Sequence, residues 1–279
     1  MRHLVLVMAF AIMVAACATT THAISPQWRG GAEGSFDRTL NVSGPAELDV
    51  STGSGSIDIR QGSAGRVEIH GRIRAGSDWL RFSRDAEDVV REIEANPPIE
   101  QNGNRIRIGR LENRDSRRNV SISYEIVVPA RASVRSHTGS GSQTIAGIEG
   151  PVDAGTGSGS ITLTDVRGRI SAETGSGSIH AGGVRGEFRA RTGSGGIRVD
   201  GEQTGPWELQ TGSGGVDIRL PQNAAFDLSA HTGSGGVTVD HPITVQGRID
   251  RHRRDVSGKV RGGGHALDVR TGSGHIRIE

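Results

Sequence analysis

The sequence contains many residue types that can take part in chemistry: ten histidines, 31 acidic residues and repeated Thr-Gly-Ser-Gly stretches. Glycine-rich loops can bind nucleotide phosphates through backbone N–H groups, and a serine between two glycines can be a nucleophile. Neither motif is complete here. The chain has no Gly-x-x-x-x-Gly-Lys-Ser/Thr and no Gly-x-Ser-x-Gly sequence, and Lys259 is its only lysine. The glycine-rich units therefore indicate repeated turns rather than one catalytic or nucleotide site, and we expect no cofactor.

Neither the histidines nor the glycine-rich turns have the arrangement of a metal site. His137 and His231 occupy equivalent positions, but in repeats five coils apart, too far to share one ion. Calcium-binding β-rolls carry an aspartate in the glycine-rich turn, and this chain has isoleucine there instead, for example Ile161. We therefore expect no bound metal. Four further histidines lie near the C-terminus without a His-Glu-x-x-His motif or a matching cysteine: His241, His252, His265 and His275.

Acidic residues could serve a glycoside hydrolase or a polysaccharide lyase only if they gathered on one face. The candidates in the repeats fall in different columns, so we expect no catalytic residues and no enzymatic activity. A carbohydrate-active β-helix enzyme stays the alternative. The acidic residues considered are Asp153, Asp165, Glu173 and Glu187.

The N-terminus predicts export. A basic start precedes an uncharged, mostly apolar run of residues 4–16, which is too short to cross a bilayer of ~30 Å but suits a signal peptide. The run ends in Val-Ala-Ala-Cys, which resembles a bacterial lipobox, and Cys17 is the only cysteine. We expect a lipoprotein signal peptide over 1–16, lipidation of Cys17 and a flexible tether over 17–35. An ordinary secretory signal cleaved after Ala18 or Ala23 is the alternative. Ala18, where an aspartate would favour the inner membrane, points to the outer membrane by resemblance to Gram-negative sorting rules.

The charge pattern argues against nucleic acid as a partner. Loss of residues 1–16 removes one arginine and no acid, which leaves 32 basic and 31 acidic residues, and no sustained basic face occurs.

One repeat accounts for much of the sequence. Thr-Gly-Ser-Gly occurs eight times, and the central intervals between its threonines are 18, 18, 18 and 19 residues, followed by 21 and 39. A period near 20 is typical of a solenoid, in which each repeat is one coil stacked on its neighbours. The eight units begin at Thr52, Thr138, Thr156, Thr174, Thr192, Thr211, Thr232 and Thr271.

Alignment on the threonine reveals columns that alternate with a period of two, the pattern of a strand with one buried face. One apolar column precedes the turn: Leu48, Val134, Val152, Ile170, Phe188, Trp207, Leu228 and Leu267. Another follows it: Ile57, Ile161, Ile179, Ile197, Val216, Val237 and Ile276, with Gln143 as the exception. The outward columns predict ion pairs between neighbouring coils: Glu173 with Arg191, Arg189 with Glu208, and Arg198 with Asp217.

These features predict an all-β protein, a parallel β-solenoid or β-helix of two-strand coils of about 18–20 residues, over 36–279. Glycine is 43 of the 279 residues and aromatics are only nine, as suits a thin core with glycine at the corners. The predicted structural turn residues of the central coils are Thr156, Gly157, Gly159, Thr174, Gly175, Gly177, Thr192, Gly193 and Gly195.

Residues 77–98 interrupt the pattern. Ala86, Val89, Val90 and Ile93 follow the spacing of one helix face, which predicts a short helix at about 84–95 that could cover the open end of the sheets. A strand-like run over 120–128 follows, and the basic segment 248–254 is expected to be a protruding loop or an outward strand.

The repeated units and the C-terminal stretch from Gly262 to Gly274 resemble the bacterial DUF4097 family, described as candidate adhesins with β-strand repeats. The resemblance covers roughly 36–279. It implies a β-solenoid exposed in the cell envelope and supplies no catalytic residues.

Together, these observations predict an exported, non-catalytic lipoprotein of the bacterial cell envelope. It would be attached to the membrane through its N-terminal lipid and would present a rigid surface for adhesion or for binding a protein or glycan. Self-association into a homo-oligomer is a further expectation. A structural or stress-response scaffold of the envelope is the remaining alternative.

Overall fold

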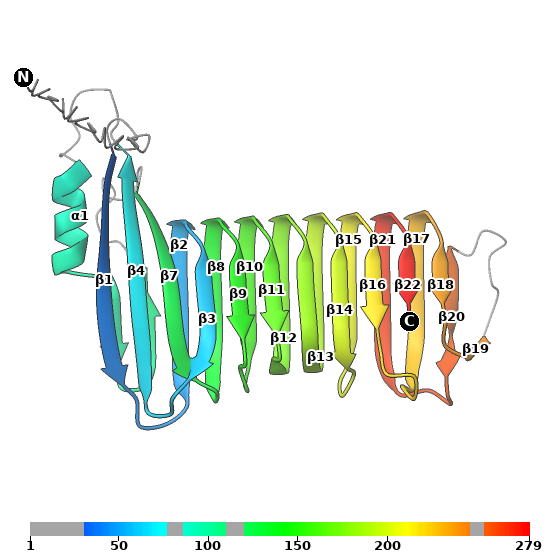
Figure 1. Cartoon of the computed structure of the whole chain (residues 1–279). Helices are drawn as coiled ribbons and strands as arrows, with labels where there is room; N and C mark the ends of the chain where they lie inside the picture. Colours follow the sequence, from blue (N-terminus) through cyan, green and yellow to red (C-terminus); the bar gives the residue numbers. More distant parts are fainter. Residues whose placement is uncertain (1–30, 77–85, 110–119, 246–253) are drawn as a thin grey trace, which may run out of the picture.

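The computed structural model describes residues 31–76, 86–109, 120–245 and 254–279, which form a long stack of β-coils with one helix at one end (Figure 1). This architecture confirms the predicted β-solenoid. Residues 1–16, Cys17, the predicted tether up to residue 30 and most of the basic segment 248–254 lie outside the described residues. No helix in the described part of the chain is long and apolar enough to cross a membrane.

Each coil consists of one strand before the Thr-Gly-Ser-Gly turn and one strand after it, and the two kinds of strand form two facing sheets. In stacking order, the first sheet contains β2 (Ala46–Ser54), β8 (Ala132–Ser140), β10 (Val152–Ser158), β12 (Arg167–Ser176), the second half of β13 (Ile179–Ser194), β15 (Trp207–Ser213), β21 (His265–Ser273) and β17 (Phe226–Ser234). The second sheet contains β3 (Ile57–Gly62), β9 (Gln143–Ala146), β11 (Ile161–Thr164), the first half of β13, β14 (Ile197–Glu202), β16 (Val216–Arg219), β22 (Ile276–Ile278) and β18 (Val237–Val239).

The parallel register is the one that the sequence columns predict. Val152 pairs with Val134 on one side and with Ile170 on the other, and Thr156 lies between Thr138 and Thr174 in the same way. Because strand residues alternate between faces, this register stacks like side chains in the core, and inward residues such as Val152 are buried while their neighbours are exposed.

The order of the last two coils differs from the order of the sequence. β21 pairs with β15 on one side and with β17 on the other, so the C-terminal coil β21–β22 lies between the β15–β16 and β17–β18 coils (Figure 1). His137 and His231 are therefore one coil further apart than the sequence order implies. The longer interval of 21 residues before Thr232 provides the chain that passes the inserted coil.

Antiparallel strands extend both ends of the stack, which the sequence did not predict. At the N-terminal end, β7 pairs with β3 in parallel, β4 pairs with β7 and β1 with β4 antiparallel, and β5 and β6 form a hairpin beside β2. At the other end, β20 pairs antiparallel with β17 and β19. The bounds are β1 (Gly31–Asn41), β4 (Arg66–Gly76), β5 (Ile99–Asn102), β6 (Arg105–Ile108), β7 (Val120–Pro129), β19 (Ile243–Val245) and β20 (Asp255–Val260). Residues 31–35, which the sequence analysis assigned to the tether, belong to β1.

The predicted helix is present as α1 (Ala86–Ala95) and packs on β1 and β4 at the end of the stack (Figure 1). Its first turn is acidic, which suits the positive end of the helix dipole. Val90 and Ile93 are buried in the core. Glu94 accepts a hydrogen bond of 2.9 Å from the backbone N–H of Ser35, so the helix is tied to the sheet that it covers.

Glycine at the corners allows the coils to approach closely. A Cβ atom at Gly175 would lie 2.6 Å from the carbonyl oxygen of Gly157, closer than real Cβ contacts occur. Gly177 has a φ of +154°, and a Cβ atom there would lie 2.0 Å from the carbonyl oxygen of Gly159. Each Thr-Gly-Ser-Gly turn of the central coils thus rests directly on the backbone of its neighbour.

We predict that Gly175→Ala destabilises the protein by about 1–3 kcal/mol, because the methyl group would push two coils apart. Gly53 holds the equivalent position in the first coil and has no atom within 4 Å of the place of a Cβ, so Gly53→Ala is the matched control and should be nearly neutral. Urea unfolding followed by circular dichroism would measure both. Equal loss of stability in the two variants would contradict close corner packing.

Candidate functional site

The predicted turn residues lie along one corner of the stack, where a ladder of threonine hydroxyl groups joins successive coils. Thr174 Oγ1 donates a hydrogen bond of 2.9 Å to the carbonyl oxygen of Gly159, and Thr192 Oγ1 donates one of 2.8 Å to that of Gly177. Both threonine side chains are buried. These residues position the outer surface next to them. They are structural rather than reactive, since their hydroxyl groups are already engaged.

A groove runs across the coils on the outer face of the first sheet, beside this corner. Its floor consists of glycines, and its volume is about 690 Å³. The side chains beside the floor come from the outward column immediately before the threonines. We call this feature the glycine groove, and it is lined by His137, Gly155, Gly157, Glu173, Gly175, Arg191, Gly193, Gln210 and Gly212 together with the threonines between them.

An ion-pair network crosses three coils at the edge of the glycine groove. Arg191 lies 2.6 Å from a carboxylate oxygen of Glu208 and 3.9 Å from Glu173, and Arg189 lies 2.9 Å from Glu208. The predicted pairs Glu173–Arg191 and Arg189–Glu208 are therefore present. Elsewhere, on the second sheet, the third predicted pair joins Arg198 and Asp217 at 3.4 Å. The hydrogen bond from Arg191 lowers the pKa of Glu208, and the same bond raises the pKa of Arg191.

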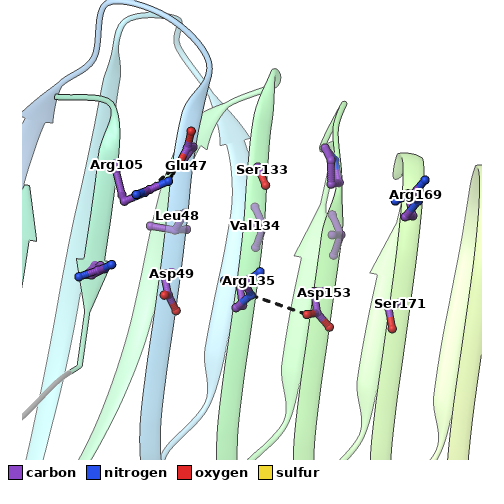
Figure 2. A pocket seen from close by; sticks show the side chains of 13 residues that line it. Glu47, Leu48, Asp49, Arg105, Ser133, Val134, Arg135, Asp153, Arg169 and Ser171 are labelled. Carbon is purple, nitrogen blue, oxygen red and sulfur yellow. Dashed lines mark hydrogen bonds and ion pairs between the residues drawn. The ribbon is translucent and has the colours of Figure 1, made fainter. Parts of the chain in front are cut away.

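A second groove of about 500 Å³ lies on the same outer face, nearer the helix end of the stack (Figure 2). We call it the arginine groove, because Arg105 and Arg107 of β6, Arg135 of β8 and Arg169 of β12 line it. Acidic side chains pair with three of these arginines: Glu47 lies 2.6 Å from Arg105, Asp153 lies 3.7 Å from Arg135, and Glu187 lies 3.0 Å from Arg169. Side chains of both charges therefore line this groove, together with Ser133 and Ser171.

The candidate acids do not form a reactive cluster in the described residues. Asp153 and Glu173 lie in different outward columns, Glu187 is paired with Arg169, and Asp165 sits in a turn with a φ of +52°. Within the ranges that the structure describes, no group of three or more histidine, cysteine, aspartate or glutamate residues could hold a metal ion.

Two histidine–aspartate pairs on the sheet surface were not predicted. His70 Nδ1 lies 2.8 Å from Asp37, and His231 Nδ1 lies 2.5 Å from Asp255. Both pairs join antiparallel strands at the ends of the stack, and the sequence repeat gives no information on those strand partners. The grooves were not predicted either. The column of corner glycines is a sequence signal for the glycine groove alone, because no glycine lines the arginine groove.

Comparison with known proteins identifies a family. A family model described as Toastrack DUF4097 matches residues 108–279. No curated protein matches the sequence significantly.

Several solved structures align with most of this chain at low similarity. A candidate cell adhesion protein from Clostridium sporogenes has 12% identity and a TM-score of 0.34, and the alignment covers 88% of this chain and 99% of that one. A candidate adhesin from Bacteroides fragilis has 9% identity and a TM-score of 0.40, with 88% and 97% covered. A candidate lipid-binding protein from Parabacteroides distasonis has 8% identity and a TM-score of 0.30, with 88% and 96% covered.

The lowered pKa of Glu208 predicts how its contribution to stability depends on pH. Such a group stabilises the fold above its unfolded pKa of about 4.3, and the contribution is lost as the pH falls through the lower folded value. Glu208→Gln should therefore reduce stability at pH 7 by no more than about 1 kcal/mol, since the pair is solvent-exposed, and the difference should vanish at acid pH. Urea unfolding from pH 2 to 8 would test this. Screening in 1 M salt should shrink the difference, and a difference that grows on acidification would contradict the assignment.

Proposed function

Because the chain belongs to the Toastrack DUF4097 family, we propose that it is a non-catalytic binding protein of the bacterial cell envelope, which holds a protein or glycan partner on the outer face of its first sheet. The observation that carries this proposal is the pair of grooves on that one face. The glycine groove and the arginine groove together draw their lining from successive coils between β6 and β15.

The repeated surface suits a partner that is itself extended. Neighbouring strands lie about 4.8 Å apart, so outward side chains of the same column recur at that spacing along the stack. Each contact with an exposed ion pair would contribute little by itself. A partner that spans several coils would gain affinity because its later contacts form within an already bound complex.

The chemistry of the face favours polar recognition. All the Phe, Tyr and Trp side chains of the described residues are buried in the core. None of them can therefore stack on a sugar ring at the surface of this part of the chain. Arginines can instead form paired hydrogen bonds with carboxylate or phosphate groups, and Glu47, Asp49 and Asp153 can accept from hydroxyl or amine groups. An extended chain with both charged and hydroxyl groups matches this arrangement best.

The scattered acids support the non-catalytic part of the proposal. Glycoside hydrolysis needs two carboxyl groups that flank one bond, and Asp153, Glu173 and Glu187 each lie in a separate column or ion pair. Turnover of an envelope polysaccharide that depends on one of these acids would instead favour the enzyme alternative.

We place the protein on the membrane through a lipid on Cys17, on the strength of the Val-Ala-Ala-Cys sequence that ends the apolar run. The solenoid would then project from the envelope, and the outer membrane is the proposed location.

Photo-crosslinking in the native envelope tests the binding face. A photoreactive residue at Ser171, in the arginine groove, should capture a discrete partner, whereas one at Thr162, on the outer face of the second sheet, should not. Both side chains are half-buried outward positions of the same repeat region, so they form a matched pair. Equal capture by both positions would contradict the proposed face.

Charge reversal should weaken that capture. We expect Arg135→Glu with Arg169→Glu to reduce the Ser171 adduct at least several-fold, because both arginines line the arginine groove. The control is Arg198→Glu with Arg219→Glu, which breaks two comparable exposed pairs on the second sheet and should leave the adduct unchanged. Mass spectrometry of the adducts would measure both.

Replacement of Cys17 tests the anchor separately. We expect Cys17→Ser to move the protein from the membrane fraction to the soluble fraction and to abolish an acyl mass on the N-terminal peptide. A Cys17→Ser protein that still sediments with membranes, together with an unmodified wild-type N-terminus, would overturn the lipid anchor and leave the binding face untouched.

A further inference from the structure

The C-terminal coil occupies a slot between two coils that precede it in the sequence. β21 and β22 lie between β15–β16 on one side and β17–β18 on the other, and all four contacts are parallel and in register (Figure 1). The last coil is thus held by its neighbours rather than by its place in the chain.

Both walls of the slot are built from the same repeat as the coil that fills it. Thr271 Oγ1 donates to the carbonyl oxygen of Gly214 at 2.9 Å, and Thr232 Oγ1 donates to that of Gly274 at 2.9 Å. Gly272 rests on Gly212 in the way that the central corner glycines rest on one another. A second copy of this chain carries a coil with the same pattern and the same apolar column, so its coil fits this slot as well.

The turn that leads into the coil is under conformational strain. Arg261, Gly262 and Gly263 connect β20 to β21, and their φ angles are +50°, +91° and +91°. Arg261 is one of only two non-glycine residues with positive φ in the described ranges, a conformation that costs a residue with a side chain roughly 1 kcal/mol or more. A Cβ atom at Gly264 would lie 2.3 Å from the carbonyl oxygen of Ala225, so the turn is also crowded.

We propose that the C-terminal coil, residues 265–279, is exchanged between two copies of the chain, each of which inserts its coil into the slot of the other. Reciprocal exchange keeps every ladder hydrogen bond and every core contact of the slot, and it replaces the strained turn at 261–264 by an extended connection. Short hinges under strain favour such swapping, and exchange of an identical element is a low-cost route to a dimer. This proposal is independent of the partner-binding face.

Disulfide trapping between two separately made proteins tests the exchange. Gln210 and Arg270 are exposed and directly opposite in the β15–β21 register. Full-length chains carrying Cys17→Ser and either Gln210→Cys or Arg270→Cys are unfolded together in urea, refolded and oxidised. Because each chain carries one cysteine, a disulfide between positions 210 and 270 joins two molecules, and its yield rises above that of collisional disulfides when the coil of one molecule lies in the slot of the other. The matched control pairs Arg270→Cys with Arg135→Cys, an exposed outward position in a distant coil.

We expect the 210–270 disulfide, identified by peptide mass spectrometry, to exceed the 135–270 disulfide at least tenfold. A chain with both Gln210→Cys and Arg270→Cys shows, by forming the 210–270 disulfide within one molecule, whether the C-terminal coil lies beside β15. A bond within that double variant, with no excess in the mixture, would show that the coil stays in its own chain and would overturn the proposal. Absence of the bond in both experiments would overturn it as well, because the coil would then not occupy the slot.

The hinge offers a second readout. Arg261→Gly relieves the positive φ at that position, so it should lower the yield of the intermolecular 210–270 disulfide several-fold. An unchanged or higher yield would show that strain in the turn does not drive exchange.

Discussion

Backbone contact between the corners of successive coils is the constraint on which the rest of the structure depends. At each central Thr-Gly-Ser-Gly turn, the carbonyl oxygen of one glycine fills the space that a Cβ atom would need on the next, as for Gly157 over Gly139 at 2.6 Å. Any larger residue would separate the coils and break the parallel ladders on both sides of the corner. The threonine hydroxyl that donates to the neighbouring glycine carbonyl fixes the same distance from inside. Together these contacts restrict neighbouring coils to a single spacing and a single strand register.

That register determines both the core and the surface. Because strand side chains alternate between faces, a fixed register stacks apolar residues inward and polar residues outward. The inward columns also contain a buried polar pair: Gln143 stands where other coils have isoleucine or valine, and Ser136 donates to it a hydrogen bond of 2.6 Å. On the outside, the same register brings Arg191 between Glu173 and Glu208 and sets four arginines around one groove. The proposed binding face is therefore a consequence of corner geometry rather than a separately folded site.

The repeat predicted the features that depend on neighbouring coils and missed those that depend on their order. Columns, ion pairs and the helix that covers the end followed from local spacing, since residues such as Val134 and Val152 need only a common period to align. The position of the C-terminal coil could not follow in this way, because Thr232 and Thr271 carry the same unit and either could stack on Thr211. The antiparallel strands β1, β4 and β20 lack the repeat, so the sequence does not indicate which strands they pair with. For this reason the His70–Asp37 and His231–Asp255 pairs were not predicted either.

That either of two coils could stack on the Thr211 coil also has a physical cause in the folded protein. A solenoid is stabilised mainly by contacts between adjacent coils, so a coil is specified by the pattern of its neighbours and not by its distance along the chain. Unique patterns would give a unique order, whereas a pattern repeated eight times allows equivalent placements that differ only in their connections. In this protein the connections determine the order of the coils. The long connection before β17 places β17 one coil position beyond β15, and the turn at Arg261 leads β21 into the position between them. Because all coils stack by the same rule, the connections between coils determine their order, and the turn with three successive positive φ angles at 261–263 precedes the coil that lies out of sequence order.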